Sequence, residues 1–206
     1  PNAGYATPVP GGSLADLGND PAYPPALYFI GVATSPKSQS DADNLAISQI
    51  QKQITVTIRV QQESGVSSKR KGNQEEIERW LNSRSTLSSR GNLQGVDIIK
   101  RTQRGKDYVA VAVLKKSKFA AEKRMAMQEA SKSLKLVAAN AMADAEAGKI
   151  ADALGARSRI EELIRVFEGE RLLLSAAEPL TEADTLPISL DQINRVFEKA
   201  LKKLSI

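Results

Sequence analysis

Apolar residues in the first half of the chain fall in short runs that predict a small sheet. Residues 27–33 read Leu-Tyr-Phe-Ile-Gly-Val-Ala and predict a strand that is buried on both faces or nearly so. Residues 93–100 and 108–114 predict two further strands, and Gly105 in the polar segment between them predicts a hairpin. Both faces of the 108–114 run are apolar, so we expect this strand at the centre of the sheet.

The apolar period changes between these strands. Residues 41–53 place an apolar residue at every fourth position, which predicts an amphipathic helix capped by Ser40 or Asp41. Over residues 54–61 apolar and polar residues alternate, which predicts a half-buried strand directly after the helix. A second helix is predicted over residues 75–87. We interpret its Trp80, the one tryptophan of the chain, as a core anchor rather than a ligand-stacking residue.

The second half of the chain predicts long helices. Residues 117–147 contain no proline or glycine and carry small or apolar residues at helical spacing, and residues 149–175 carry a similar row. Gly148 between them marks a stop, so we expect an antiparallel helical hairpin. The apolar stripe is first the core of this hairpin. A partner-binding seam is the second interpretation, because a two-helix arm buries only part of its apolar surface.

These patterns give the chain four parts and an α+β fold class. We predict a small antiparallel sheet with helices packed on one side, followed by a long antiparallel helical hairpin and a C-terminal helix. The last helix opens with a capping box at Ser189. The parts are a Pro/Gly-rich linker or tail at 1–26, an α+β domain at 27–116, the hairpin arm at 117–178 and an amphipathic helix at 188–206.

The amino-acid composition excludes several kinds of catalytic and metal-binding site. The 206 residues include neither cysteine nor histidine, so thiol and histidine catalysis is excluded and zinc, copper or iron sites are not expected. A carboxylate site for magnesium or calcium stays open. The adjacent acidic pairs Glu75-Glu76 and Glu161-Glu162 diverge on a helix and do not form an acid–base pair. We therefore predict a protein that is not an enzyme and uses no cofactor.

The net charge of +5 comes with clusters of basic residues. An anionic partner is one interpretation, and solvated loops and turn tips are the other. No aromatic residues are interleaved with these clusters, so we expect no specific binding of nucleic acid. The candidate anion-binding residues are Lys69, Arg70, Lys71, Arg101, Arg104 and Lys106.

Several of these segments occur together in a known family. They are Pro24-Pro25, the Tyr-Phe-Ile-Gly-Val-Ala run at 28–33, the helix with Ala42 and Ala46, the Gln-Ile-Gln-Lys-Gln-Ile-Thr-Val run at 49–56, Leu-Gln-Gly-Val-Asp-Ile at 93–98 and Tyr-Val-Ala-Val-Ala-Val-Leu at 108–114. In this order they resemble the LPP-twenty type of bacterial outer-membrane lipoprotein domain, which is related to the N-terminal domain of a flagellar outer-membrane ring protein. The resemblance covers about residues 22–116.

The resemblance implies a fold and a location. It implies a small α+β domain in the periplasm or on the periplasmic face of the bacterial outer membrane, without catalytic residues. Ala33 stands where the family frequently has a second glycine. The sequence has no lipid-bearing cysteine, so peripheral membrane association would require an N-terminal lipid anchor that these 206 residues do not contain.

We therefore predict a non-enzymatic protein of the cell envelope, a lipoprotein fragment by its resemblance, with a structural or protein-interaction role. Its partner, or a second copy, is expected to bind the helical arm. The alternative is a binding module for an anionic polymer or head group, which would use the basic loops. Salt dependence separates the two, because binding to a polyanion weakens steeply with salt and apolar binding does not.

Overall fold

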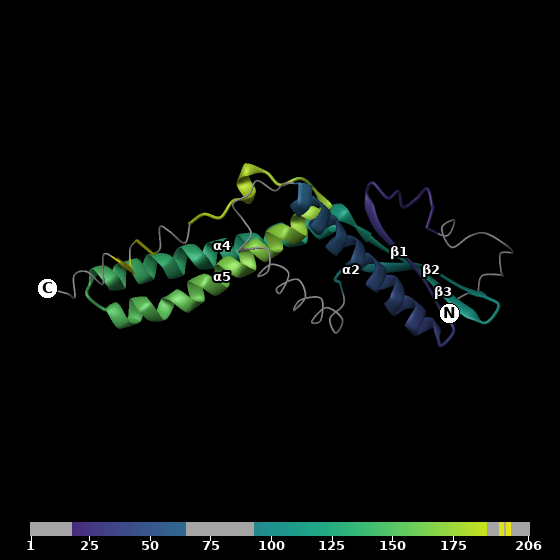
Figure 1. Ribbon diagram of the computed structural model, residues 1–206, viewed down its shortest axis with the longest axis horizontal. Helices are drawn as coiled ribbons and strands as arrows, with labels where there is room; N and C mark the ends of the chain where they lie inside the picture. The colour runs from purple at the N-terminus through teal and green to yellow at the C-terminus, as the bar shows by residue number, and fades with distance from the viewer. Residues whose placement is uncertain (1–17, 65–92, 189–193, 196, 199–206) are drawn as a thin grey trace, which may run out of the picture. The chain divides into compact units, whose positions relative to one another are not determined.

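The structure is a computed structural model with an α+β fold, as predicted (Figure 1). It describes residues 18–64, 93–188, 194–195 and 197–198. The chain divides into two compact units, which are treated separately below. The sheet unit is Pro1–Ala120 with Ala176–Glu178, and the arm unit is Ala121–Ser175 with Pro179–Ile206.

Three antiparallel strands form the sheet in the order β1-β3-β2. They are β1 (Tyr28–Ser35), β2 (Val96–Arg104) and β3 (Asp107–Lys115). The central place of β3 and its burial on both faces agree with its two apolar faces. Gly105 turns the β2–β3 hairpin at a φ of 60°, a left-handed conformation that glycine adopts without steric cost.

Strand β1 is buried on one face rather than both. Phe29, Gly31 and Ala33 are buried, whereas the residues between them are half-buried. The expectation was burial on both faces or nearly so. Full burial holds for one face only, because β1 lies at the edge of the sheet, where helix α2 covers one of its faces and the other is half-buried. On the other face Ile30 and Val32 pack beside the buried Val109 and Val111 of β3.

One helix, α2 (Gln39–Ser64), replaces the predicted helix and strand at 41–61. The strand prediction for residues 54–61 was wrong because the four-residue apolar row continues through it. Ile50, Ile54 and Ile58 all lie on the buried face of α2. Ser38 caps the helix by accepting a hydrogen bond from the N–H of Asp41 at 3.1 Å, so the predicted caps Ser40 and Asp41 lie inside the first turn instead.

The threonines of this segment fit a helix in spite of their preference for strands. The hydroxyl of Thr55 donates to the carbonyl oxygen of Gln51 at 3.0 Å, and that of Thr57 donates to Gln53 at 2.9 Å. Such bonds to the preceding turn satisfy a threonine hydroxyl within a helix. The period-two appearance of the sequence comes from Val56 and Val60, which alternate with polar residues along the chain but are exposed on the helix.

Helix α2 lies very close to β1. A Cβ atom at Gly31 would overlap with the carbonyl oxygen of Ala46, so no larger residue fits at this position without movement of the backbone. Ala42 and Ala46 are fully buried at this contact. Small residues on both elements thus bring the helix axis close to the edge strand, and this approach forms the groove described below.

The predicted hairpin arm is present. Helix α4 (Lys116–Glu146) and helix α5 (Ile150–Ala177) are joined at Gly148, which has a φ of 80°. The N–H of Lys149 bonds to the carbonyl oxygen of Asp144 at 2.8 Å, the pattern of a glycine-terminated helix. The apolar stripe packs within the arm, in agreement with its first interpretation. The buried cluster is Leu134, Ala138, Ala141, Ala145, Ile150, Ala153, Ile160, Leu163, Ile164 and Phe197.

The C-terminal segment contributes to the same cluster. Its described residues 194–195 and 197–198 are helical, and Phe197 is buried against the arm. The rest of the predicted helix at 188–206, with its capping box at Ser189, lies outside the described residues apart from Ile188. So do the predicted helix at 75–87 with Trp80 and the basic residues Lys69, Arg70 and Lys71. Within the described part of the chain, no helix has the length and apolarity needed to cross a membrane.

Candidate functional site

The predicted basic residues that the structure describes lie on the β2–β3 hairpin. Arg101 pairs with Asp43 of α2, with 3.1 Å between its Nε and the Oδ2 of the carboxylate. Arg104 ends β2, where it faces Asp107 across the hairpin, and Lys106 lies exposed at the tip. An anion at this hairpin would have to compete with Asp43 for Arg101. Anion binding here stays a prediction.

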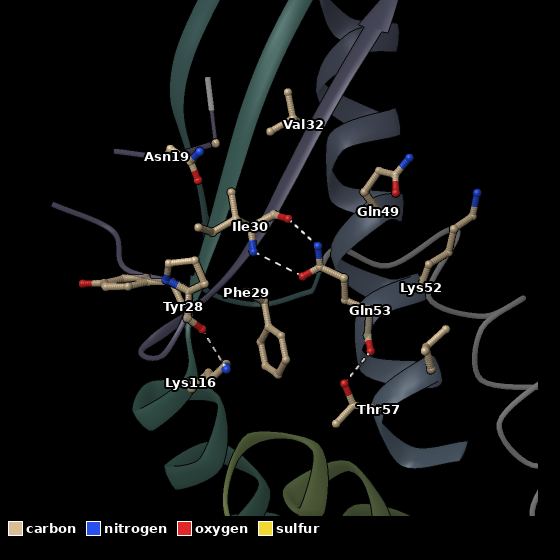
Figure 2. A pocket seen from close by; sticks show the side chains of 13 residues that line it. Asn19, Tyr28, Phe29, Ile30, Val32, Gln49, Lys52, Gln53, Thr57 and Lys116 are labelled. Atoms are coloured by element: carbon tan, nitrogen blue, oxygen red, sulfur yellow. Dashed lines mark hydrogen bonds between the residues drawn. The ribbon is translucent and has the colours of Figure 1, made fainter. Parts of the chain in front are cut away.

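A different feature lies at the other edge of the sheet, beside β1. A groove of about 690 Å³ runs between β1 and α2, and the segment before β1 contributes Asn19 and Pro25 to its wall (Figure 2). Strand β1 contributes Ile30 and Val32 to the lining, and about two and a half turns of α2, from Gln49 to Thr57, contribute polar and apolar side chains. The close approach of α2 to β1 places backbone groups of an edge strand beside side chains of a helix.

Every second residue of β1 directs its backbone N–H and C=O groups away from β3, toward the open edge of the sheet. The N–H of Tyr28 turns away from β3 to the carbonyl of Pro24, and Ile30 turns both of its backbone groups to Gln53. Backbone directions alternate along a strand, so Val32 and Thr34 present their N–H and C=O groups to the same side. In the part of the chain that the structure describes, no group forms a hydrogen bond with these four backbone groups of Val32 and Thr34.

Gln53 caps the middle of this edge (Figure 2). Its Nε2 donates to the carbonyl oxygen of Ile30 at 2.6 Å, and the N–H of Ile30 donates to its Oε1 at 3.4 Å. A carboxamide carries one donor and one acceptor in the arrangement of a peptide group. The side chain of Gln53 therefore occupies the place that a residue of a fourth strand would take beside Ile30.

The groove is positively charged. Lys52 lies exposed on α2 and Lys116 lies at the start of α4, and none of the lining residues that the structure describes is acidic. The Nζ of Lys116 donates to the carbonyl of Pro25 at 2.9 Å and lies 5.1 Å from the ring centroid of Phe29. Lys52 has no such contacts in the described structure.

An apolar stripe on α2 continues from the groove. Val56 lines the groove and is 58% exposed, and Val60, one turn later, is 57% exposed. Leu45, about three turns before Val56, lies on the same side of the helix and is 43% exposed. Large apolar residues aligned on one face of a helix, next to a groove, indicate a surface for binding a partner.

The buried ionisable groups lie elsewhere, in the arm unit. Burial raises the pKa of Asp184, but hydrogen bonds from the N–H and hydroxyl of Thr181, both at 2.8 Å, together with the guanidinium of Arg124, outweigh it. The net effect is a pKa below the ordinary value of 3.8. The carboxylate of Glu170 lies 3.4 Å from the Nζ of Lys123. These pairs join segments of the arm unit and do not line the groove.

The groove thus offers hydrogen bonds, positive charge and apolar surface, without an acid–base pair. The described residues contain no group of three side chains that could hold a metal ion. The arrangement is that of a binding site for an extended ligand. The sequence pattern does not reveal the groove, because it predicts that a helix ends at Gln53 and that residues 54–61 form a strand. Continuation of the apolar row to Ile58 is the signal that could have found it.

Comparison with known proteins returned no match to a family model, a curated protein or a solved structure. The resemblance of residues 22–116 to the LPP-twenty type of lipoprotein domain therefore stays a prediction.

Proposed function

We propose that this chain is a non-enzymatic protein of the bacterial cell envelope that acts by binding another protein. The envelope location, in the periplasm or on the periplasmic face of the outer membrane, rests on the sequence resemblance alone. The binding role rests on one observation, the exposed apolar stripe Leu45, Val56 and Val60 beside the groove. Burial of such a stripe by a partner is favourable at roughly 25 cal/mol per Å² of apolar surface.

The arm is the second candidate for the binding surface. Most residues of its apolar stripe are buried in the core of the arm, so less apolar surface is exposed to a partner. Met125 and Leu136 are nevertheless 65% and 63% exposed. They lie about three turns apart on one side of α4, so a partner or a second copy could contact both. The spacing of this pair equals that of Leu45 and Val56, but α4 adds no third exposed residue comparable to Val60 among the described residues, so the pair offers a partner less apolar surface.

Binding of an anionic polymer is the third candidate. Its described residues are partly engaged, since Arg101 is held by Asp43. This alternative predicts that binding is lost as salt is raised, whereas contact through the apolar stripe persists.

Site-specific photo-crosslinking in the intact protein tests the proposal. A photoreactive residue replaces Val56 in one variant and Leu136 in a matched variant, because both positions are helical, apolar and similarly exposed. Each variant is irradiated in envelope preparations of the source bacterium at low and high salt. We expect a discrete protein adduct at position 56 that survives high salt.

The other outcomes are equally clear. An adduct at position 136 alone moves the binding surface to the arm. Adducts that disappear at high salt favour the anionic partner. The absence of any protein adduct at both positions contradicts the proposal.

A further inference from the structure

We propose that the groove between β1 and α2 binds an extended, acidic segment of another polypeptide, which adds to β1 as a fourth strand. This inference rests on the proposed function, since it names the kind of partner that occupies the same groove. Strand addition uses backbone hydrogen bonds for affinity and side-chain pockets for specificity. The edge of β1 and the side chains of α2 provide these two parts.

The two edges of the sheet differ in how they are protected. Strand β2 carries a register shift between Ile98 and Lys100 and several charged residues, of which Arg101 is an example. Irregularities and charges are the usual means by which proteins prevent pairing at an edge. Strand β1 keeps one register with β3 over its eight residues and contains no charged residue or proline. Of the two edge strands, β1 is therefore the one whose backbone can pair with an additional strand.

The available length of β1 is short. At its start, the N–H of Tyr28 is bonded to Pro24 at 3.1 Å, so pairing cannot extend in that direction. Ile30, Val32 and Thr34 present outward backbone groups, and the strand ends at Ser35. A partner thus pairs through roughly five of its own residues, because facing residues of two strands advance together.

Charge decides what kind of segment fits. Lys52 and Lys116 line the groove, and its described lining residues include no acidic side chain, so acidic residues that flank the paired segment are attracted. A second copy of this chain fits less well. Pairing of β1 with another β1 would bring the lysines of both copies together without a counter-charge. We therefore assign the groove to a different, acidic chain.

Gln53 controls access to the centre of the edge. Its carboxamide already makes both bonds to Ile30, so an incoming strand pairs first with Val32 and Thr34 and then displaces the side chain. The exposed position of Gln53 on α2 leaves room for this movement. Removal of the carboxamide abolishes the competition, and we expect Gln53→Ala to bind the partner about three- to tenfold more tightly.

A labelled peptide tests the inference with the full chain. The probe is a blocked peptide of about eight residues, alternating valine and threonine, with aspartates at both ends, and binding is followed by fluorescence anisotropy. Its matched controls carry three N-methyl groups each. Methyl groups on consecutive residues block both edges of the peptide, whereas methyl groups on alternate residues leave one edge intact. We expect the first control to lose binding and the second to retain it.

Two variants of the protein address the two sources of affinity. Val32→Pro removes one outward N–H, and proline is tolerated at such a position of an edge strand, so binding should weaken about tenfold. Lys52→Glu should weaken binding of the aspartate peptide about threefold and strengthen binding of a version flanked by lysines. If Val32→Pro fails to fold, hydrogen exchange of the Val32 and Thr34 amides in the unmodified chain replaces it, with slowing expected when the peptide is added.

The contrary results are specific. Equal binding of the two N-methylated controls, or absence of binding by any peptide, overturns strand addition. A concentration-dependent dimer that forms through Val32 without peptide assigns the edge to a second copy and overturns the acidic partner. If the adduct at position 56 forms but the peptide does not compete with it, the proposed function stands and this inference fails. If the peptide binds but no protein adduct forms, the inference stands and the proposed function fails.

Discussion

The sheet unit and the arm unit use their polar groups in opposite ways. In the arm, the carboxylates of Glu170 and Asp184 are each only 4% exposed and face Lys123 and Arg124. In the sheet unit, the backbone groups of Val32 lie at an edge where no described residue bonds to them. The arm thus pairs these two buried carboxylates within its own structure, whereas the sheet unit leaves the backbone groups of Val32 available to a partner.

The difference follows from secondary structure. A helix satisfies its backbone groups internally, so a helical hairpin offers a partner only its side chains. An open sheet always has two edges with unsatisfied backbone groups. In this protein one edge is charged and irregular, and the other is capped by the single side chain of Gln53. The arm therefore has only side chains to offer a partner, whereas the β1 edge also has backbone groups with which a strand can pair.

The largest expected effect concerns the contact that forms the groove. Gly31→Ala should lower the free energy of unfolding of the sheet unit by about 3 kcal/mol, because the new methyl group overlaps with the backbone of Ala46. Denaturant unfolding followed by circular dichroism measures this. Gly155→Ala in α5 is the matched control. It meets no atom within 4 Å and should stabilise the arm by about 0.5–1 kcal/mol. Equal effects of both changes would show that α2 does not constrain β1.

The next effect tests whether the arm depends on its internal ion pair. Lys123→Met leaves the carboxylate of Glu170 buried without this partner and should destabilise the arm by about 2–3 kcal/mol in urea unfolding. Arg159→Met removes an ion pair of the same arm whose two side chains are 59% and 57% exposed, and it should cost less than about 0.5 kcal/mol. Similar costs would mean that burial does not distinguish the two pairs.

A third effect appears in the pH dependence of the arm. Asp184→Asn should lower stability by about 1–2 kcal/mol at neutral pH, because a buried carboxylate loses its charge-assisted hydrogen bonds. The pKa of Asp184 lies below 3.8 in the folded protein, so the unfolded chain binds the proton first as pH falls. The stabilisation is therefore complete above this value and is lost below it. Unfolding curves at several pH values should show that the free energies of unfolding of the unmodified chain and of Asp184→Asn converge in acid. A difference that stays constant with pH would contradict this role of Asp184.

The smallest effect on stability is expected at the cap. Gln53→Ala should change the free energy of unfolding by less than about 1 kcal/mol, because the hydrogen bonds lie on the surface. Hydrogen exchange of the Ile30 amide should nevertheless accelerate, while exchange of the Val111 amide in the central strand stays unchanged. An unchanged Ile30 amide would show that the carboxamide does not protect the edge.

Local patterns predicted much of the fold. The two apolar faces of the 108–114 run correctly placed β3 at the centre of the sheet, and Gly105 and Gly148 correctly marked the hairpin and the joint of the arm. Each of these signals is carried by a few neighbouring residues, whose backbone conformation or burial they largely determine. The basic residues are also apparent in the sequence. The pairing of Arg101 with Asp43 is not, because it joins residues that are distant in the chain.

The groove could not be predicted in the same way. The alternation over 54–61 favours a strand by local preference, which is a matter of about 1 kcal/mol or less per residue. Burial of an isoleucine contributes about 1.5–3 kcal/mol. The helix buries Ile54 and Ile58 in one row with Ile50 and leaves Val56 and Val60 exposed, whereas a strand would have placed these valines on the same face as Ile54 and Ile58. The contact of Gln53 with Ile30 then follows from the length and position of α2.

The sequence by itself determined the α+β class, the turn and helix-end glycines and the absence of thiol and histidine chemistry, because these depend on residue identity and short-range pattern. The tertiary structure decided that residues 54–61 are helical, that β1 is an edge strand, and that one glutamine meets the backbone of that edge. These depend on which distant surfaces bury one another, and the free energy of that burial exceeds the local preference of the chain.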